Sequence, residues 1–116
     1  MSLLVHVWVW DDDGGRDVLD DPPGVSDLAG PERWRQEVWG AGSAFGARLL
    51  PRLDGNDLWV PPGEVDDLLA ECALYRRNLR ALAEFPDHAD TIVTRLSNIE
   101  AAARRARDRH GGVVVW

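Results

Sequence analysis

The first apolar run of the chain alternates like a strand but has no polar face. Residues 3–10 read LLVHVWVW; the odd positions from 5 to 9 are valine, and the even positions from 6 to 10 are His6, Trp8 and Trp10. Side chains of a strand alternate between its two faces, so both faces of this segment are apolar. A strand of this kind is covered, at least in part, on both sides. We therefore expect residues 3–10 to form an interior strand of a sheet.

Two later segments repeat their apolar residues at helical spacing. Residues 64–84 and residues 88–109 each carry an apolar stripe at steps of three and four positions. Pro86 interrupts the pattern between them, and Asp87 is a suitable N-cap residue for the second helix. Because the connection at 85–87 is short, we expect two antiparallel helices that pack together on one face of the sheet.

The segments between the strand and the long helices are shorter and more polar. Residues 11–30 combine Gly, Pro and Asp with little periodicity, which predicts a long acidic surface loop. A short helix is expected over 31–39, because the segment opens with proline, which is tolerated at the first helical position. Residues 47–53 and 57–60 flank Asp54-Gly55-Asn56, a sequence typical of a β-hairpin turn.

The end of the chain returns to strand-like residues. Val113 to Trp116 are uniformly apolar and follow two glycines that would end the second long helix. We expect this strand to lie beside residues 3–10 rather than at an edge of the sheet. The complete order predicts a single α+β domain over 1–116. Its small mixed or antiparallel sheet would combine the N-terminal strand, the hairpin and the C-terminal strand, with a long antiparallel helical hairpin packed on one face.

Length and composition fit one globular domain. The chain has 116 residues, of which 45% are hydrophobic and 28% are charged, and a chain of this size can bury a core without disulfides or metal. The one cysteine, Cys72, lies in an apolar helical stretch, which indicates a small core residue in a reducing compartment. The apolar run at 3–10 is too short to span a bilayer and lacks the features of a signal peptide. We therefore expect a cytoplasmic protein that does not bind membranes.

Charge is distributed unevenly along the chain. The formal net charge is −7, and residues 1–30 hold seven aspartates against Arg16. All 13 basic residues are arginine, as a GC-rich genome would favour, so arginine alone does not indicate anion recognition. The arginines of 104–109 are expected to form a solvated helix face. An acidic N-terminal third argues against nucleic-acid binding and favours a basic partner, or no partner.

The sequence contains no strong signature of an enzyme or a metal site. Asp11-Asp12-Asp13-Gly14-Gly15 with Asp17 could offer oxygen ligands to Ca²⁺ or Mg²⁺, but the spacing does not match an EF-hand loop, and a solvated turn is the simpler interpretation. The three histidines are not spaced as zinc ligands. The glycine-rich stretch 40–46 lacks the lysine of a P-loop, and no serine lies in a nucleophile motif. We predict no catalytic residues, no metal and no cofactor.

The six tryptophans are the most informative residues of the chain. Burying all of them in so small a core is difficult, because each indole N–H also needs a hydrogen-bond partner. One or two are expected at the surface beside the acidic loop, and tryptophan is enriched at binding hot spots. An aromatic anchor surrounded by carboxylates suits a basic protein partner. The predicted partner-binding residues are Asp11, Asp12, Asp13, Asp17, Asp20 and Asp21, with Trp34 or Trp39 as anchors.

Six segments of the chain also carry a family resemblance. They are LLVHVWVW, WRQEVWG, LLPRLDGNDLWVPP, LLAECALYRRNLRAL, RLSNIEAAARRA and GGVVVW. Together they resemble small uncharacterised acidic proteins of GC-rich bacteria. In size, acidity and α+β content the chain is also similar to immunity proteins of polymorphic toxin systems. This second resemblance implies an immunity or antitoxin protein that neutralises a cognate toxin. Two alternatives remain open: a ligand-binding or enzymatic pocket near His6 and Trp8, and a structural subunit or homodimer.

Overall fold

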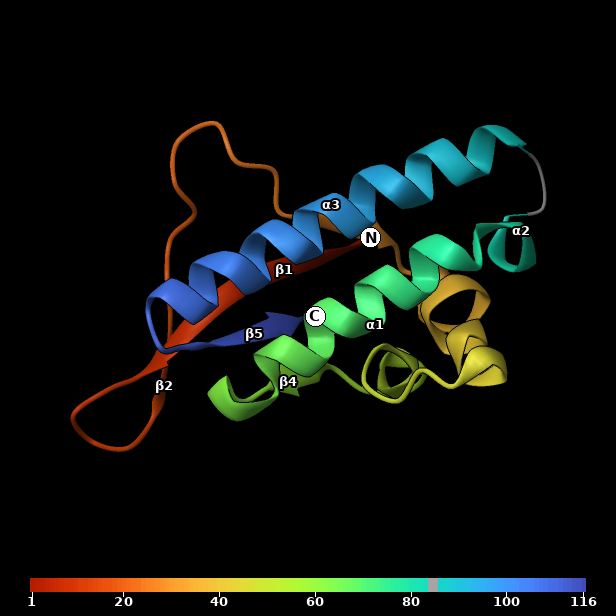
Figure 1. Cartoon of the computed structure of the whole chain (residues 1–116). Coiled ribbons are helices and arrows are strands. Elements are labelled where there is room, and N and C mark those ends of the chain that lie inside the picture. The colour runs from red at the N-terminus through yellow and green to blue at the C-terminus, as the bar shows by residue number, and fades with distance from the viewer. Residues whose placement is uncertain (84–85) are drawn as a thin grey trace.

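A five-stranded antiparallel sheet organises the computed structural model, which describes residues 1–83 and 86–116 (Figure 1). Four strands follow the order β2-β1-β5-β4, and β3 pairs with β1 as well. The bounds are β1 Ser2–Trp10, β2 Arg16–Val18, β3 Leu28–Pro31, β4 Leu58–Val60 and β5 Gly112–Val115. Together with the helices, this sheet confirms the predicted α+β class.

Strand β1 is bonded along both of its edges. On one edge Leu4 and Trp116 exchange backbone hydrogen bonds of 2.8 and 3.0 Å. On the other edge the backbone N–H of Val5 donates to the carbonyl of Asp27 at 2.8 Å. Strands β2 and β3 therefore pair with different parts of the same edge of β1. Strand β5 pairs with the opposite edge and lies between β1 and β4. The predicted interior position of 3–10 and the insertion of the C-terminal strand beside it are both confirmed.

Two antiparallel helices cover one face of the sheet, as predicted (Figure 1). They are α1 (Val65–Arg77) and α3 (Pro86–Asp108), and the short α2 (Leu79–Leu82) follows α1. The predicted helix 64–84 is thus interrupted at Asn78, whose backbone has left the helical conformation. Residues 84–85 and the side chains of 86 and 87 lie outside the described residues, and so does the predicted cap Asp87. No helix in the described part of the chain is long and apolar enough to cross a membrane.

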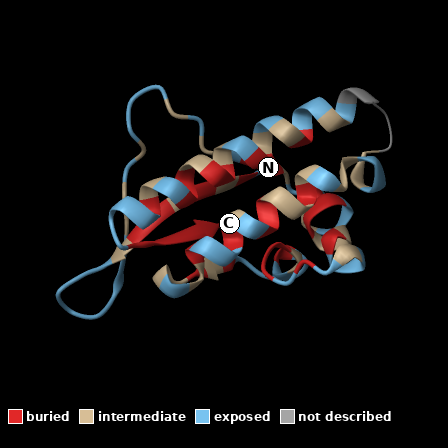
Figure 2. Cartoon of the chain, in the orientation of Figure 1, coloured by how far each residue is buried: buried red, intermediate tan, exposed pale blue. Residues whose placement is uncertain are grey.

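The core lies between the helices and the inner face of the sheet (Figure 2). Leu3, Val5 and Val7 of β1 are buried there, as the alternation of the strand requires. The apolar stripe of α3 packs against them, and its residues are buried as well: Ile92, Leu96, Ile99 and several alanines. Full burial of a leucine or isoleucine is worth about 1.5–3 kcal/mol relative to exposure, so this layer supplies much of the driving force for folding.

The acidic segment 11–30 is not one long loop, so this prediction is wrong. The chain turns tightly at 11–15, where Asp11 and Gly15 are joined by a backbone hydrogen bond of 2.9 Å, and it returns as β2. It then reaches β3 along the same edge of β1. Backbone hydrogen bonds to the open edge of β1 order this segment. Because these bonds do not involve side chains, they produce no apolar periodicity in the sequence.

The predicted helix over 31–39 forms only in its second half, and the predicted hairpin arm over 47–53 is wrong. Pro31 ends β3, and the chain becomes helical only at η1, a π-helix over Arg35–Trp39 that continues as the 3-10 helix η2 (Gly40–Phe45). Residues Leu50–Leu53 form a further 3-10 helix, η3, and a fourth, η4, spans Pro62–Glu64. Pro51 lies in the first turn of η3, a position that proline favours. In addition, the carboxylate of Glu71 in α1 accepts hydrogen bonds from the backbone N–H groups of 48–50, which a neighbouring strand would otherwise accept.

Candidate functional site

The face of the sheet opposite the long helices is lined by aromatic side chains. Directly paired residues of antiparallel strands share a face, and His6 pairs with Val114, which also pairs with Trp59. The even positions of β1 therefore share this face with the centre of β4. Trp116 joins them, because its indole lies against the imidazole of His6. We call this surface the aromatic face; its rings are His6, Trp8, Trp10, Trp59 and Trp116.

The rings of the aromatic face form a continuous series of edge-to-face contacts. Ring centroids are 4.7 Å apart from Trp10 to Trp8 and 6.1 Å from Trp8 to Trp59. The series continues over 5.4 Å from Trp59 to Trp116 and over 6.0 Å from Trp116 to His6. Each such contact adds about 0.5–1.5 kcal/mol beyond its buried area. The strip is therefore a stable surface rather than a set of independently moving side chains.

Arg16 of β2 reaches across the aromatic face. Its guanidinium carbon lies 4.5 Å from the ring centroid of Trp59 and 5.6 Å from that of Trp8. The Trp8 ring itself lies over Gly112 of β5, where a Cβ would be 2.4 Å from that ring. A guanidinium over an indole is attracted to the ring by about 0.5–2 kcal/mol. Arg16 thus covers the centre of the strip and leaves its two ends open.

The exposed tryptophans are not the ones predicted as anchors. Trp34 and Trp39 are 7% and 0% exposed, and the Trp39 indole N–H donates to the carbonyl of Ala29 at 3.1 Å. Both belong to the core, and neither presents a large exposed ring to a partner. The exposed rings are Trp10 and Trp116, at 55% and 37%. The position of Trp10 at the end of an apolar strand, directly before Asp11, is the sequence signal that identifies it.

The predicted acidic residues have three different environments. Asp11 shapes the turn, because its carboxylate accepts backbone hydrogen bonds from Asp13 at 2.9 Å and Gly15 at 2.7 Å. Asp21 is half-buried beside His6. The remaining four carboxylates are exposed and belong to Asp12, Asp13, Asp17 and Asp20. Asp11 is exposed as well, but its carboxylate is engaged in the turn, so these four are the exposed members of the predicted set whose carboxylates do not shape the turn.

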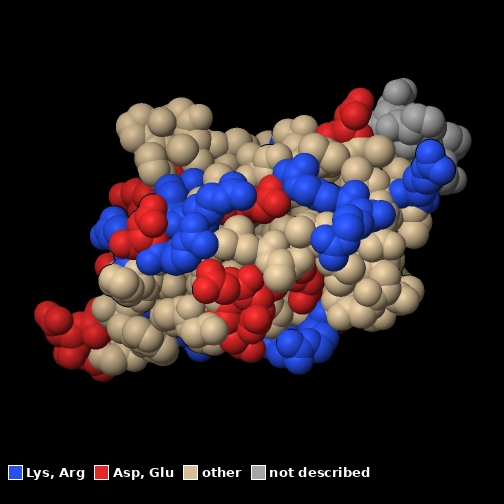
Figure 3. Space-filling view, viewed as in Figure 1, with Lys and Arg blue, Asp and Glu red and all other residues tan. Residues whose placement is uncertain are grey.

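The helix layer and the β1–β2 turn differ in charge (Figure 3). Arginines and acidic side chains lie side by side over the helix layer, and two of the arginines are paired: Arg76 binds Glu100, and Arg107 lies 3.6 Å from Asp66. Acidic side chains stand out at the end of the molecule where the β1–β2 turn projects. The fold therefore sets an acidic end next to Trp10 against a helix surface of mixed charge.

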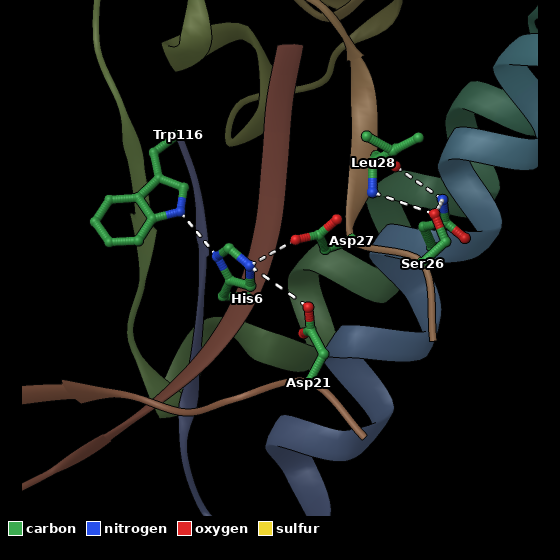
Figure 4. Close-up of polar contacts among 7 residues, drawn as sticks. His6, Asp21, Ser26, Asp27, Leu28 and Trp116 are labelled. Atoms are coloured by element: carbon green, nitrogen blue, oxygen red, sulfur yellow. Dashed lines mark hydrogen bonds and ion pairs between the residues drawn. The ribbon is translucent and has the colours of Figure 1, made fainter. Parts of the chain in front are cut away.

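His6 is held between an indole and two carboxylates (Figure 4). The indole N–H of Trp116 donates to Nδ1 of His6 at 2.9 Å. Nδ1 must therefore carry the lone pair, which places the proton of the neutral ring on Nε2. That proton points to Asp27 at 3.0 Å, and Asp21 lies 3.6 Å away. With both nitrogens engaged, His6 has no free lone pair for general-base catalysis in this arrangement.

The buried ionisable groups of the helices have structural partners. Burial, with a smaller contribution from Glu100, raises the pKa of the Cys72 thiol, so it stays protonated and unreactive. Burial also raises the pKa of Tyr75, whose hydroxyl donates to the carbonyl of Trp39. A groove of about 600 Å³ lies between η1 and the start of α3, lined in part by Trp34, Val38 and Ile92 and away from His6 and Trp8.

No family model, curated protein or solved structure matches this chain. The features of the structure that bear on function are the aromatic face, the acidic turn and the His6 cluster.

Proposed function

We propose that this chain is a noncatalytic protein-binding domain that uses one end of the aromatic face and the acidic β1–β2 turn to bind a basic partner. The observation that carries the proposal is Trp10, a large apolar side chain that is 55% exposed and directly precedes the acidic turn. Exposed tryptophan in a rigid aromatic setting is typical of a binding hot spot.

The charge beside Trp10 favours a basic partner. Among the described residues, the side chains of Asp12 and Asp13 make no hydrogen bond or ion pair, so their charge is not compensated within the chain. A second copy of the chain bound at the same surface would bring equal charges together, which costs energy. Arginine or lysine side chains of a different protein would be attracted to the turn and would accelerate association.

The immunity-protein hypothesis is a specific form of this proposal. A toxin that acts on an anionic substrate needs a basic surface, and carboxylates at the end of the aromatic face would cover it. The tryptophan would supply the desolvated centre of the interface, and the aspartates would supply its charged rim. The aromatic face supports binding more than catalysis, because His6 uses both ring nitrogens in hydrogen bonds.

Quantitative affinity purification with matched variants tests the proposal. The test variant carries Trp10→Ala with Asp12→Asn and Asp13→Asn. The control carries Asp67→Asn and Asp90→Asn, two exposed carboxylates of the helix layer. Proteins from the native source that the wild type and the control retain, and that the test variant loses, should be basic. Restored growth on co-expression of the wild-type chain with a toxic partner would identify an immunity protein. Retention of the same proteins by all three chains would contradict the proposed surface.

A further inference from the structure

We propose that His6, Asp21 and Asp27 form a site for a divalent transition-metal ion, and that metal binding releases Trp116 from His6. One ligand atom of each residue lies within 4.8 Å of the other two, and the three side chains are 16%, 22% and 31% exposed. The histidine comes from the rigid centre of β1, and the aspartates come from the segment between β2 and β3. This inference is independent of the proposed protein partner.

The separations of the three ligand atoms are close enough for a small metal ion. Nε2 of His6 lies 3.0 Å from Oδ2 of Asp27 and 3.6 Å from Oδ2 of Asp21. Tetrahedral zinc with bonds near 2.0 Å needs ligand atoms about 3.3 Å apart. The two carboxylate oxygens lie within 4.8 Å of each other, so a change of the aspartate rotamers that brings them to about 3.3 Å would admit the ion, with water as a fourth ligand. One imidazole nitrogen with two carboxylates suits Zn²⁺, Co²⁺ or Mn²⁺ better than Ca²⁺.

The charges of the cluster point to a cation as well. The carboxylates of Asp21 and Asp27 both face Nε2 of His6, whose single N–H cannot donate fully to both of them. In the described part of the chain no arginine lies within ion-pair distance of Asp21 or Asp27. A divalent ion would balance both negative charges at the point where they approach each other.

Metal binding at Nε2 is incompatible with the present hydrogen bond of Trp116. A metal needs the lone pair of Nε2, so the proton on Nε2 leaves to solvent and another proton is taken up at Nδ1. The ring stays neutral, with no net change in protons. The new Nδ1–H would then face the indole N–H of Trp116 at 2.9 Å, donor against donor. Trp116 must therefore turn away, and its contact with Trp59 changes with it.

The relative energies allow this exchange. A single hydrogen bond contributes about 0.5–1.5 kcal/mol, whereas coordination by several protein ligands is many times stronger. Loss of the Trp116 bond should weaken metal binding by only about five-fold. The same argument predicts that Trp116→Phe, which has no N–H to displace, binds the metal about five-fold more tightly than the wild type.

The test is a titration of the full chain with Zn²⁺ and Co²⁺. Calorimetry should give one site, Co²⁺ should develop the visible absorption of a low-symmetry site, and the indole N–H resonance of Trp116 should shift while that of Trp39 does not. His6→Gln and Asp21→Asn should lose the site. The Asp21→Asn chain retains the His6–Asp27 bond and so should stay folded, which circular dichroism would verify. Asp17→Asn is the matched control and should bind like the wild type.

Three results would overturn the inference. They are the absence of a calorimetric signal in the wild type, equal affinity in the wild type and Asp21→Asn, and binding that leaves the Trp116 indole resonance unchanged. Equal affinity in Asp21→Asn would place the ion on other surface carboxylates. An unchanged indole resonance would mean that Nε2 of His6 is not a ligand.

Discussion

Replacement of Glu71 should cost more stability than replacement of any exposed carboxylate, because its side chain anchors the η3 region to α1. Glu71 is buried, and its carboxylate accepts backbone hydrogen bonds from Arg48 at 3.1 Å, Leu49 at 2.9 Å and Leu50 at 2.7 Å. A hydrogen bond to a charged group contributes about 1.5–3 kcal/mol, and each buried donor left without a partner costs about 1–3 kcal/mol. These terms overlap, so Glu71→Ala should lose about 3–5 kcal/mol. Glu71→Gln, which retains one carbonyl oxygen, should lose about 1–3 kcal/mol.

Urea denaturation followed by circular dichroism measures both losses as shifts of the midpoint at constant slope. Glu37→Ala is the control, since Glu37 is exposed and its pair with Arg33 should contribute less than about 1 kcal/mol. Amide exchange at 48–50 should also accelerate in Glu71→Ala. A Glu71→Ala chain that is as stable as Glu37→Ala would refute the role assigned to this carboxylate.

Two further predictions concern the core and its response to pH. Gly112→Ala should destabilise the fold by about 3 kcal/mol in the same assay, because a Cβ there would lie 2.2 Å from a carbonyl oxygen of β4 and 2.4 Å from the Trp8 ring. Gly63→Ala, which meets no atom within 4 Å, should be close to neutral. Burial raises the pKa of Cys72 and of Tyr75 above their ordinary values of 9.0 and 10.0, so the unfolded chain loses these protons first. The contribution of these two groups to stability should therefore be constant below about pH 8 and fall as pH rises above 9, by up to about 1.4 kcal/mol per pH unit for each group. Cys72→Ala should delay the onset of that fall, and an unchanged pH profile of Cys72→Ala would contradict the assignment.

The sequence predicts the elements that have a strong apolar period of their own. The run at 3–10 and the stripes of the two long helices are such elements, and the structure contains all three. The region from 11 to 60 is different, because distant partners determine its conformation. Strands β2 and β3 are ordered by the edge of β1, and η3 is ordered by a carboxylate 21 residues further along the chain. Long-range hydrogen bonds of this kind produce no periodic pattern of apolar residues in the sequence.

The candidate sites differ in the same way: one is made of neighbours in the sequence, and the other is assembled by the fold from distant residues. The neighbourhood of Trp10 and Asp11 is local in sequence, so an exposed aromatic residue beside acidic side chains could be predicted. Trp34 and Trp39, the predicted anchors, are buried, and only the folded sheet shows which tryptophans face solvent. The His6 cluster could not be predicted from spacing, since Asp27 is 21 residues and Trp116 is 110 residues from His6. A search of the sequence for closely spaced histidines and cysteines does not detect a site in which one histidine meets carboxylates from distant positions.

The most direct test of the account is an NMR footprint of the purified chain with its basic partner. We expect the Trp10 indole resonance and the backbone amides of 11–17 to change on binding, with smaller changes at Trp116. The exposed side of α1 and α3 should stay unperturbed, and the association rate should fall as salt is added. Changes confined to the helix layer, with the Trp10 indole unaffected, would refute the proposal that the aromatic face and the acidic turn form the binding surface.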